Sequence, residues 1–321
     1  MYPQNSVFPN CQPPKPKRLI LCFVCAYSLY PIASTPNLIL SQKKKITPPK
    51  MSVKHDTIKK EVISMKVRIT TLPIPTEPYP RTIRILLPDD FEEVNRTYRV
   101  LYMHDGQNLF DDHIAYGGHS WGIKEIIEDL KITDLIVVGL DNSDLRFFEY
   151  SPWKSVPDVR KITAIDMGGL GDIYASWVSE QVVPYIDHHY PTKKSAQNRM
   201  IAGSSMGGYI SAYIAAKYPD IFSIAGIFSL ASWFNEPEFL RYIGDHVHDS
   251  SQRFFISVGS HETSNPNDLS FNQLYLDNSR RLRDLLKDKG IKDIFYIETE
   301  DVHNELAWRK VFPSFVTWAQ K

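Results

Sequence analysis

Residues 203–207 read Gly-Ser-Ser-Met-Gly and lie between a short apolar run and a longer run with helical periodicity. Residues 199–202 predict a buried strand, and residues 206–217 predict an amphipathic helix that stops before Pro219. At such a strand-to-helix turn, Gly-x-Ser-x-Gly lifts the serine hydroxyl out of the sheet and within reach of a base. An isolated match also occurs in ordinary Gly/Ser turns, but this setting favours an α/β fold with Ser205 as the nucleophile.

Strand-like and helix-like segments alternate from residue 62 onward. The expected strands cover residues 62–69, 82–87, 99–103, 135–140, 199–202, 223–229, 254–258 and 294–298. The expected helices cover residues 121–130, 172–189, 206–217, 274–289 and 305–320. The first two strands should pair antiparallel through a proline-rich turn, whereas strands separated by helices should be parallel and covered on both faces. Residues 62–321 are therefore expected to form one α/β domain with an eight-stranded, mostly parallel sheet.

Two long connections in this pattern are expected to lie over the ends of the strands. They cover residues 141–171 and 230–252 and carry no strong periodic signal. Loops at strand ends commonly shape ligand pockets, so these two should border the site.

The first 55 residues differ in charge from the rest of the chain. They contain no Asp or Glu but eight Lys or Arg, so residues 56–321 carry 29 basic against 37 acidic residues, a net charge of about −8. An acidic domain argues against nucleic acid as a partner. We interpret residues 1–55 as a disordered basic leader, or as an extension upstream of a start at Met51.

The leader also contains a mostly apolar run at residues 19–33. This run resembles the core of a signal peptide, but it is too short for a stable membrane span and it contains Pro31. We therefore expect a cytoplasmic protein, or a secreted or membrane-associated one if the leader is a genuine signal. All three cysteines lie in this leader, so a cysteine nucleophile or a cysteine-ligated zinc site is excluded for the domain.

The candidate base is His303. In α/β-hydrolases the catalytic residues follow one another as serine, acid and histidine, so the base should come late in the chain. His303 follows the last expected strand and opens the last expected helix, whereas His246 and His248 are expected in a polar loop. The alternative interpretation of residues 301–305, a helix-capping polar cluster, gives no reason for a histidine.

The candidate acid is Glu262, which follows the strand expected at residues 254–258. A carboxylate there would hold the tautomer of His303 and stabilise its imidazolium form. Asp268 is the second candidate, and Asp277 is a more distant third because it is expected on a helix.

The loop after the third strand should supply one of two oxyanion donors. Gly106 permits close approach of the backbone, so the N–H of Gln107 is expected beside the N–H of Met206. The same loop carries elements of a metal site, although their spacing matches no metal-hydrolase motif. Those residues are His104, Asp105, Asp111, Asp112 and His113.

Three segments together resemble the putative-esterase family of α/β-hydrolases, which includes S-formylglutathione hydrolase, feruloyl and enterochelin esterases and mycolyltransferases. They are residues 104–111 (His-Asp-Gly-Gln-Asn-Leu-Phe-Asp), 203–208 (Gly-Ser-Ser-Met-Gly-Gly) and 303–308 (His-Asn-Glu-Leu-Ala-Trp). The resemblance covers about residues 62–321. It implies an α/β-hydrolase fold and no metal or organic cofactor.

The resemblance also implies site residues. The family's nucleophile, base and acid fall on Ser205, His303 and Glu262, with Ser260 where the family has threonine. Its oxyanion amides fall on Gln107 and Met206. Four further residues are expected at the pocket, either contacting substrate or as structural anchors: Trp121, Arg146, Glu149 and Tyr150.

These patterns predict a serine carboxylic-ester hydrolase that acts on a small-molecule ester through an acyl-enzyme. Two alternatives remain at this stage: an acyltransferase, in which an alcohol replaces water, and a non-catalytic binding protein on a hydrolase fold. The acyl and alcohol parts of the substrate and the oligomeric state leave no signal in the sequence.

Overall fold

The computed structural model describes residues 64–321, apart from residues 94, 164–165, 249–250 and 264–268. The leader, its cysteines and the possible start at Met51 lie outside the described residues, as does Asp268. The domain boundary expected at residue 62 therefore stays a prediction.

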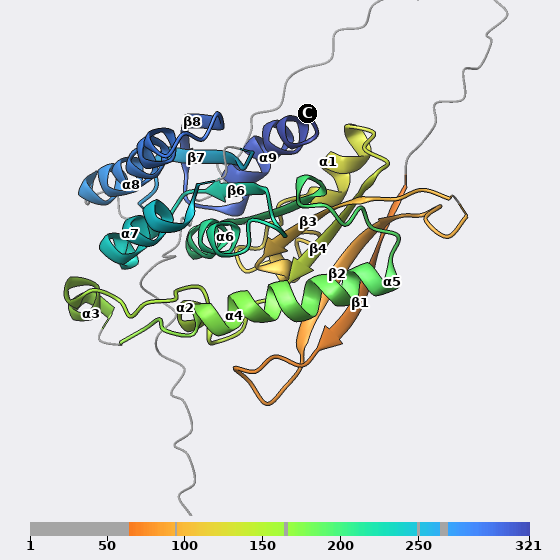
Figure 1. Cartoon of the computed structure of the whole chain (residues 1–321), viewed down its shortest axis with the longest axis horizontal. Coiled ribbons are helices and arrows are strands. Elements are labelled where there is room, and N and C mark those ends of the chain that lie inside the picture. Colours follow the sequence, from red (N-terminus) through yellow and green to blue (C-terminus); the bar gives the residue numbers. More distant parts are fainter. Residues whose placement is uncertain (1–63, 94, 164–165, 249–250, 264–268) are drawn as a thin grey trace, which may run out of the picture. The chain divides into compact units, whose positions relative to one another are not determined.

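A single eight-stranded sheet runs through the described chain in the order β1-β2-β4-β3-β5-β6-β7-β8 (Figure 1). β1 and β2 pair antiparallel, β2 pairs antiparallel with β4, and all later neighbours are parallel. The strands are β1 (Met65–Leu72), β2 (Arg81–Pro88), β3 (Arg99–His104), β4 (Leu135–Leu140), β5 (Arg199–Ser204), β6 (Ile224–Phe228), β7 (Arg253–His261) and β8 (Asp293–Val302). The expected strands and their directions are confirmed, but some bounds differ. β1 begins three residues later, where its register with β2 starts, and β7 and β8 run three and four residues beyond their expected ends.

Helices cover both faces of this sheet (Figure 1). They are α1 (Ile123–Asp129), α2 (Arg146–Glu149), α3 (Pro157–Thr163), α4 (Gly171–Trp177), α5 (Val183–His189), α6 (Met206–Lys217), α7 (Glu236–His246), α8 (Leu269–Asp288) and α9 (Glu305–Ala319). Short 3-10 turns are η1 (Gly106–Asn108), η3 (Ala196–Asn198) and η4 (Ser232–Phe234), and η2 (Val178–Val182) is a π-helical segment between α4 and α5.

Side chains of the central strands alternate between two apolar clusters, one on each face. On β5, Ile201 packs with the cluster that includes α4 to α8, whereas Met200 and Ala202 pack with the cluster of α1 and α9. This alternation follows from the two-residue period of a strand, so runs buried on both faces read as continuously apolar. The sheet is therefore a rigid platform whose carboxyl edge can hold side chains in place.

The connections expected to be irregular contain helices. Residues 141–171 hold α2 and α3, and residues 230–252 hold α7, so the expectation that His246 lies in a loop was wrong: it ends α7. The side chain of Asn235 caps α7 by accepting a hydrogen bond from the Glu238 N–H, a start signal that the sequence did contain.

Two other helix expectations need correction. The single helix expected over residues 172–189 is interrupted by η2, where the hydrogen-bonding pattern widens for one turn. The helix α6 was expected to be amphipathic, but it is buried on every side from Met206 to Ala216, because it lies between the sheet and the neighbouring helices α4 and α7.

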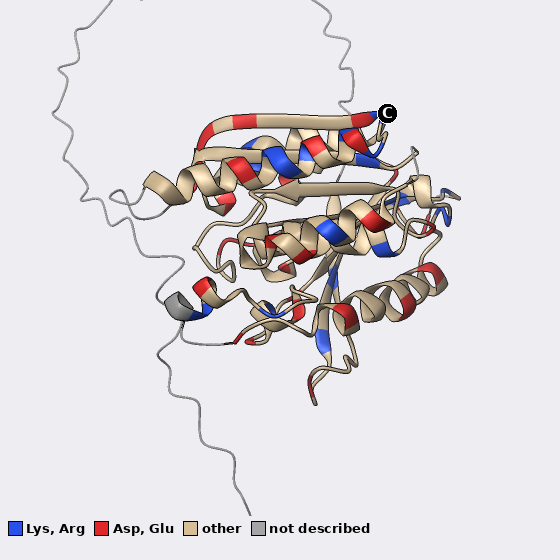
Figure 2. Ribbon diagram, turned by 60° about the vertical axis from the view of Figure 1, so that its left-hand side comes forward, with Lys and Arg blue, Asp and Glu red and all other residues tan. Residues whose placement is uncertain are grey.

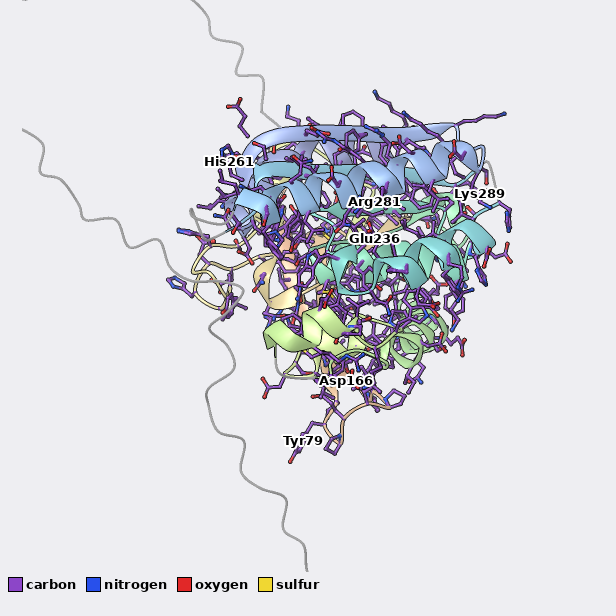
Figure 3. The ribbon with its side chains drawn as sticks, turned by 90° about the vertical axis from the view of Figure 1, so that its left-hand side faces the viewer. Tyr79, Asp166, Glu236, His261, Arg281 and Lys289 are labelled. Atoms are coloured by element: carbon purple, nitrogen blue, oxygen red, sulfur yellow. The ribbon has the colours of Figure 1, made fainter. Side chains whose placement is uncertain are left out.

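Ion pairs tie the outer helices to one another. Figure 3 shows Arg281 of α8 beside Glu236 of α7, where the guanidinium donates two hydrogen bonds of 2.9 Å to the carboxylate. Arg81 of β2 likewise donates two hydrogen bonds of 3.0 Å to Glu149 of α2, whose side chain is fully buried. Figure 2 shows acidic and basic residues interspersed along the helices that cover the sheet.

Candidate active site

Ser205 occupies the sharp turn between β5 and α6, with φ 58° and ψ −123°. Its N–H donates a hydrogen bond of 2.8 Å to the carbonyl of Phe228 at the end of β6. A Cβ atom on Gly203 would lie 2.7 Å from the carbonyl carbon of Gly207, so the turn cannot close with a side chain there. A Cβ atom on Gly207 would lie 3.4 Å from its nearest neighbour, the Cβ of His104. Glycine is therefore required by space at position 203 more strictly than at position 207.

His303 and Glu262 meet at the carboxyl edge of the sheet, where β7 and β8 end. Nδ1 of His303 donates a hydrogen bond of 2.5 Å to Oε2 of Glu262. The carboxylate is fully buried and the imidazole is 11% exposed. Figure 3 marks this edge by His261, the last residue of β7. The structure thus brings the two predicted residues into direct contact, and their roles as base and acid stay predictions.

The second oxygen of Glu262 is also held. Its Oε1 accepts hydrogen bonds of 2.6 Å from the Gly259 N–H and from the Ser229 hydroxyl. Ser229 in turn accepts a hydrogen bond of 2.9 Å from the indole N–H of Trp308. Because three donors face the carboxylate, its buried oxygens are hydrogen-bonded and its orientation is fixed.

Tyr275 of α8 packs against the histidine, and the sequence analysis missed it. Its ring centroid lies 5.0 Å from that of His303. Burial raises the pKa of Tyr275 far above its usual value, so the phenol stays neutral and can donate a hydrogen bond. Among the described residues, no hydrogen bond joins the Ser205 hydroxyl to His303 directly. No periodic signal distinguishes Tyr275 from an ordinary core position of α8.

An aromatic wall continues from Tyr275. The ring centroid of Phe271 lies 5.4 Å from that of Tyr275 and 5.2 Å from that of Trp233 in η4. Ala231, two residues before Trp233, donates its N–H to the carbonyl of Ser205 at 3.4 Å. The wall therefore borders the candidate nucleophile.

The other candidate acids differ in position. Asp277 lies on α8, as expected, and it is exposed there, where its carboxylate accepts a hydrogen bond from Gln273 and lies 3.6 Å from Arg280. Asp268 lies outside the described residues.

Gln107 lies in η1, directly after β3. The preceding Asp105 has φ 58° and ψ 47°, a left-handed conformation that turns the chain into η1. The Gln107 side chain accepts a hydrogen bond of 3.0 Å from the Asn142 N–H, which ties η1 to the chain after β4. Gln107 and Met206 each lie in the first turn of a helix, where backbone N–H groups have no intrahelical acceptor. Their role as oxyanion donors stays a prediction.

Arg146 holds Asp105 in its strained conformation. Its Nε and Nη2 atoms donate hydrogen bonds of 2.7 Å to the two carboxylate oxygens of Asp105, and Asn142 donates a third. Burial tends to raise the pKa of Asp105, but the charge and hydrogen bonds of Arg146 outweigh it and hold the pKa below its usual range. A Cβ atom on Gly207 would lie 3.5 Å from Oδ2 of Asp105, so this ion pair abuts the serine turn.

His104 is buried beneath the same turn. Its Nδ1 lies 2.9 Å from the Tyr174 hydroxyl, and its ring packs against Tyr150 at 5.2 Å between centroids. Within the described chain its Nε2 has no hydrogen-bond partner. Burial lowers the pKa of His104 to about 3, so the ring is neutral at neutral pH.

The four residues expected at the pocket occupy different environments. Trp121 is 2% exposed and packs against Phe228 at 4.9 Å between ring centroids, in the cluster of α1 and α9. Tyr150 is fully buried and accepts a hydrogen bond of 3.2 Å from the Asp105 N–H. Arg146 is 21% exposed, and Glu149 is bound to Arg81. These positions suit anchors for Trp121, Tyr150 and Glu149, and contact of the four residues with substrate stays a prediction.

The residues of the alternative metal site have other partners. Asp111 accepts a hydrogen bond from the His113 N–H, and Asp112 accepts two from Ser120. Across the described ranges, no three His, Cys, Asp or Glu side chains gather as a set of metal ligands. The described helices also include none with the length and apolar character needed to cross a bilayer.

Comparison with known proteins adds to this geometry. The profile of a family described as putative esterase matches residues 77–318. A relative named YbbA, an uncharacterized protein of Bacillus subtilis, is 25% identical over 241 residues, which cover 74% of this chain and 92% of YbbA. An endo-1,4-beta-xylanase/feruloyl esterase of Xylanibacter ruminicola is 25% identical over 238 residues, which cover 72% of this chain but 28% of that protein.

A solved structure of similar architecture is the siderophore hydrolase EstA from Aspergillus nidulans. It superposes with a TM-score of 0.61 and 14% identity, over 79% of this chain and 94% of EstA. At 14% identity, the superposition shows that the two chains share a fold and nothing more. The chain therefore has the α/β-hydrolase fold.

Proposed function

The chain belongs to the putative esterase family, and on this premise we propose that it hydrolyses small carboxylic esters through an acyl-enzyme on Ser205. The observation that carries the proposal is the 2.5 Å contact between His303 and Glu262. Ser205 lies close to this pair, because its N–H donates to Phe228 and the next residue, Ser229, donates to Glu262. A histidine oriented by a buried carboxylate is the arrangement that activates a serine hydroxyl.

The first half of the reaction forms the acyl-enzyme. Ser205 Oγ attacks the ester carbonyl carbon while Nε2 of His303 takes the hydroxyl proton. The backbone N–H groups of Gln107 and Met206 stabilise the negative charge on the carbonyl oxygen. His303 then gives the proton to the departing alcohol as the bond between carbon and alcohol oxygen breaks.

The second half releases the acid. His303 takes a proton from water, the resulting hydroxide attacks the acyl carbon, and Ser205 recovers its proton as the acid leaves. Glu262 accepts the hydrogen bond of Nδ1 throughout, so the proton that moves is always on Nε2. The Gly259 N–H and the Ser229 hydroxyl, which Trp308 holds in place, keep that carboxylate aligned through both steps.

The aromatic wall of Trp233, Phe271 and Tyr275 supports an acyl group with an aromatic or broad apolar face. One relative is named a feruloyl esterase, which agrees with an aromatic acyl group. A panel of p-nitrophenyl esters tests this point. We expect kcat/KM to be higher for benzoyl and cinnamoyl esters than for straight-chain esters of equal carbon number.

Two measurements test the proposal as a whole. A fluorophosphonate probe should label the intact chain and fail to label Ser205→Ala. Product analysis with a competing alcohol should give the free acid as the main product. Labelling that persists without Ser205 overturns the proposed nucleophile, and predominant transfer to the alcohol makes the chain an acyltransferase.

A further inference from the structure

Glu305 is a partly buried carboxyl group that the proposed mechanism does not use. It opens α9 two residues after His303, and its Oε1 accepts a hydrogen bond of 3.1 Å from the Asn108 side chain. Burial raises the pKa of Glu305, and the nearby charge of Asp105 raises it further, whereas His303 and Arg146 lower it. The carboxyl group therefore lies within electrostatic range of the base and of the segment that carries Gln107.

Asn108 also holds the chain segment of Tyr116 and Gly117 beside this carboxyl group. Its Oδ1 accepts a hydrogen bond of 3.0 Å from the Tyr116 N–H, and a Cβ atom on Gly117 would lie 3.2 Å from Oε2 of Glu305. The side chains of Tyr116 and Leu306 are 54% and 41% exposed. Glu305 thus lies against the chain segment of Tyr116 and Gly117, at a place where neighbouring side chains reach solvent.

The charges around Glu305 do not cancel. Arg146 is bound through two hydrogen bonds to Asp105, and His303 is bound to Glu262. Within the described residues, Glu305 makes no ion pair of its own. Arg309, one turn further along α9, has its guanidinium against Gly122. The Glu305 carboxylate is therefore not neutralised by an ion pair in the part of the chain that the structure describes.

We propose that Glu305 makes the enzyme select esters whose leaving alcohol carries a cationic nitrogen. The inference rests on the proposed function, in which His303 gives its proton to the leaving alcohol. The alcohol must then depart beside His303, which is the side where Glu305 lies. A carboxylate at that side attracts an alkylammonium group through opposite charge.

Three benzoate esters separate this selection from ester hydrolysis itself: the esters of choline, of its uncharged carbon isostere and of anionic isethionate. They share one acyl group and differ mainly in the charge of the alcohol. The measurement is kcat/KM of the full chain at about pH 8 and low ionic strength, where a carboxylate is ionised and screening is weak. We expect the choline ester to exceed the isostere by roughly tenfold, and the isethionate ester to be the slowest.

Glu305→Gln keeps the shape and the acceptor for Asn108 but removes the charge. We expect it to bring the ratio of choline ester to isostere within about twofold. Glu93→Gln is the matched control, because Glu93 is exposed in the turn between β2 and β3, at the opposite edge of the sheet. Leu306→Lys adds a positive charge beside Glu305 and should lower the same ratio if Glu305→Gln does not fold.

The outcomes are distinguishable. A ratio near one in the unaltered chain, or a ratio that survives both Glu305→Gln and Leu306→Lys, overturns the inference. A ratio that falls equally in Glu93→Gln also overturns it, because the effect would then come from net charge. If the isostere is not hydrolysed and the fluorophosphonate probe does not label Ser205, the proposed function fails instead.

Discussion

The imidazole of His303 lies 2.5 Å from the carboxylate of Glu262, although the two residues are 41 positions apart in the chain. Parallel pairing of β7 and β8 brings them together, because both strands end at the same edge of the sheet. A Cβ atom on Gly259 would lie 2.2 Å from the Asp301 carbonyl, so the end of β7 can approach β8 this closely only through a glycine there. The contact is thus a product of sheet register and one close backbone approach.

Ser205→Ala should abolish ester hydrolysis without unfolding the protein. Loss of the nucleophile in a serine hydrolase lowers kcat by about 10⁴-fold or more, because the remaining residues cannot form the acyl-enzyme. The measurement is turnover of p-nitrophenyl benzoate, with thermal unfolding as the control for the fold. Turnover within tenfold of the unaltered chain would remove Ser205 from the mechanism.

Glu262→Gln should lower kcat by roughly 10²- to 10⁴-fold with little change in KM. The amide can donate to Nδ1 of His303 and so favours the tautomer that cannot accept the serine proton. Asp277→Asn is the matched control, because Asp277 is exposed on α8, and it should retain full activity. If Asp268→Asn were inactive and Glu262→Gln active, the acid would have to be reassigned.

Protonation of His104 should make the fold sensitive to mild acid. Burial lowers its pKa from 6.5 to about 3, so between these values the unfolded chain binds a proton that the folded chain does not. The contribution to stability is therefore fully present above about pH 6.5 and is lost as the pH falls toward about 3, by up to about 1.4 kcal/mol per pH unit.

Urea unfolding from about pH 7 to about pH 4 measures this effect. His104→Gln removes the titrating group, so its free energy of unfolding should fall less steeply with decreasing pH. Equal slopes for the two proteins would mean that His104 is protonated in the folded state.

Trp121→Leu should destabilise the fold and leave KM unchanged. The ring packs against Phe228, Trp308 and Phe312, so the smaller side chain leaves a cavity and costs roughly 2 kcal/mol or more. The measurements are the thermal midpoint and KM for p-nitrophenyl benzoate. A raised KM without a lower midpoint would place Trp121 at the substrate instead.

The strand pattern could be predicted because it depends on local rules. The central strands are continuous apolar runs, which is the signature of strands buried on both faces, and β5 is the clearest case, whereas β1 alternates between buried and more exposed residues. His303 and Glu262 were proposed because this fold places its base directly after the last strand and its acid after the strand before. The structure brings their side chains into contact, and their catalytic roles stay predictions.

The residues that sequence reasoning missed act through contacts between distant elements. Tyr275 reads as an ordinary core position of α8, and only the packing of α8 against β7 brings its ring to His303. Ser229 follows a strand, as site residues often do, but its role as donor to Glu262 depends on the register of β6 and β7. Glu305 was considered only as part of a helix-capping cluster. That interpretation places it at the start of α9 but does not predict that its carboxylate lies near the base.

Ser205 has φ 58° and ψ −123°, a backbone conformation that glycine adopts without strain and serine does not. The residue that would give the most stable fold at this position, glycine, is therefore not the residue that the proposed reaction needs, serine. Selection for thermal stability alone should therefore enrich Ser205→Gly. Such a variant would be more stable than the unaltered chain but would lack the proposed nucleophile.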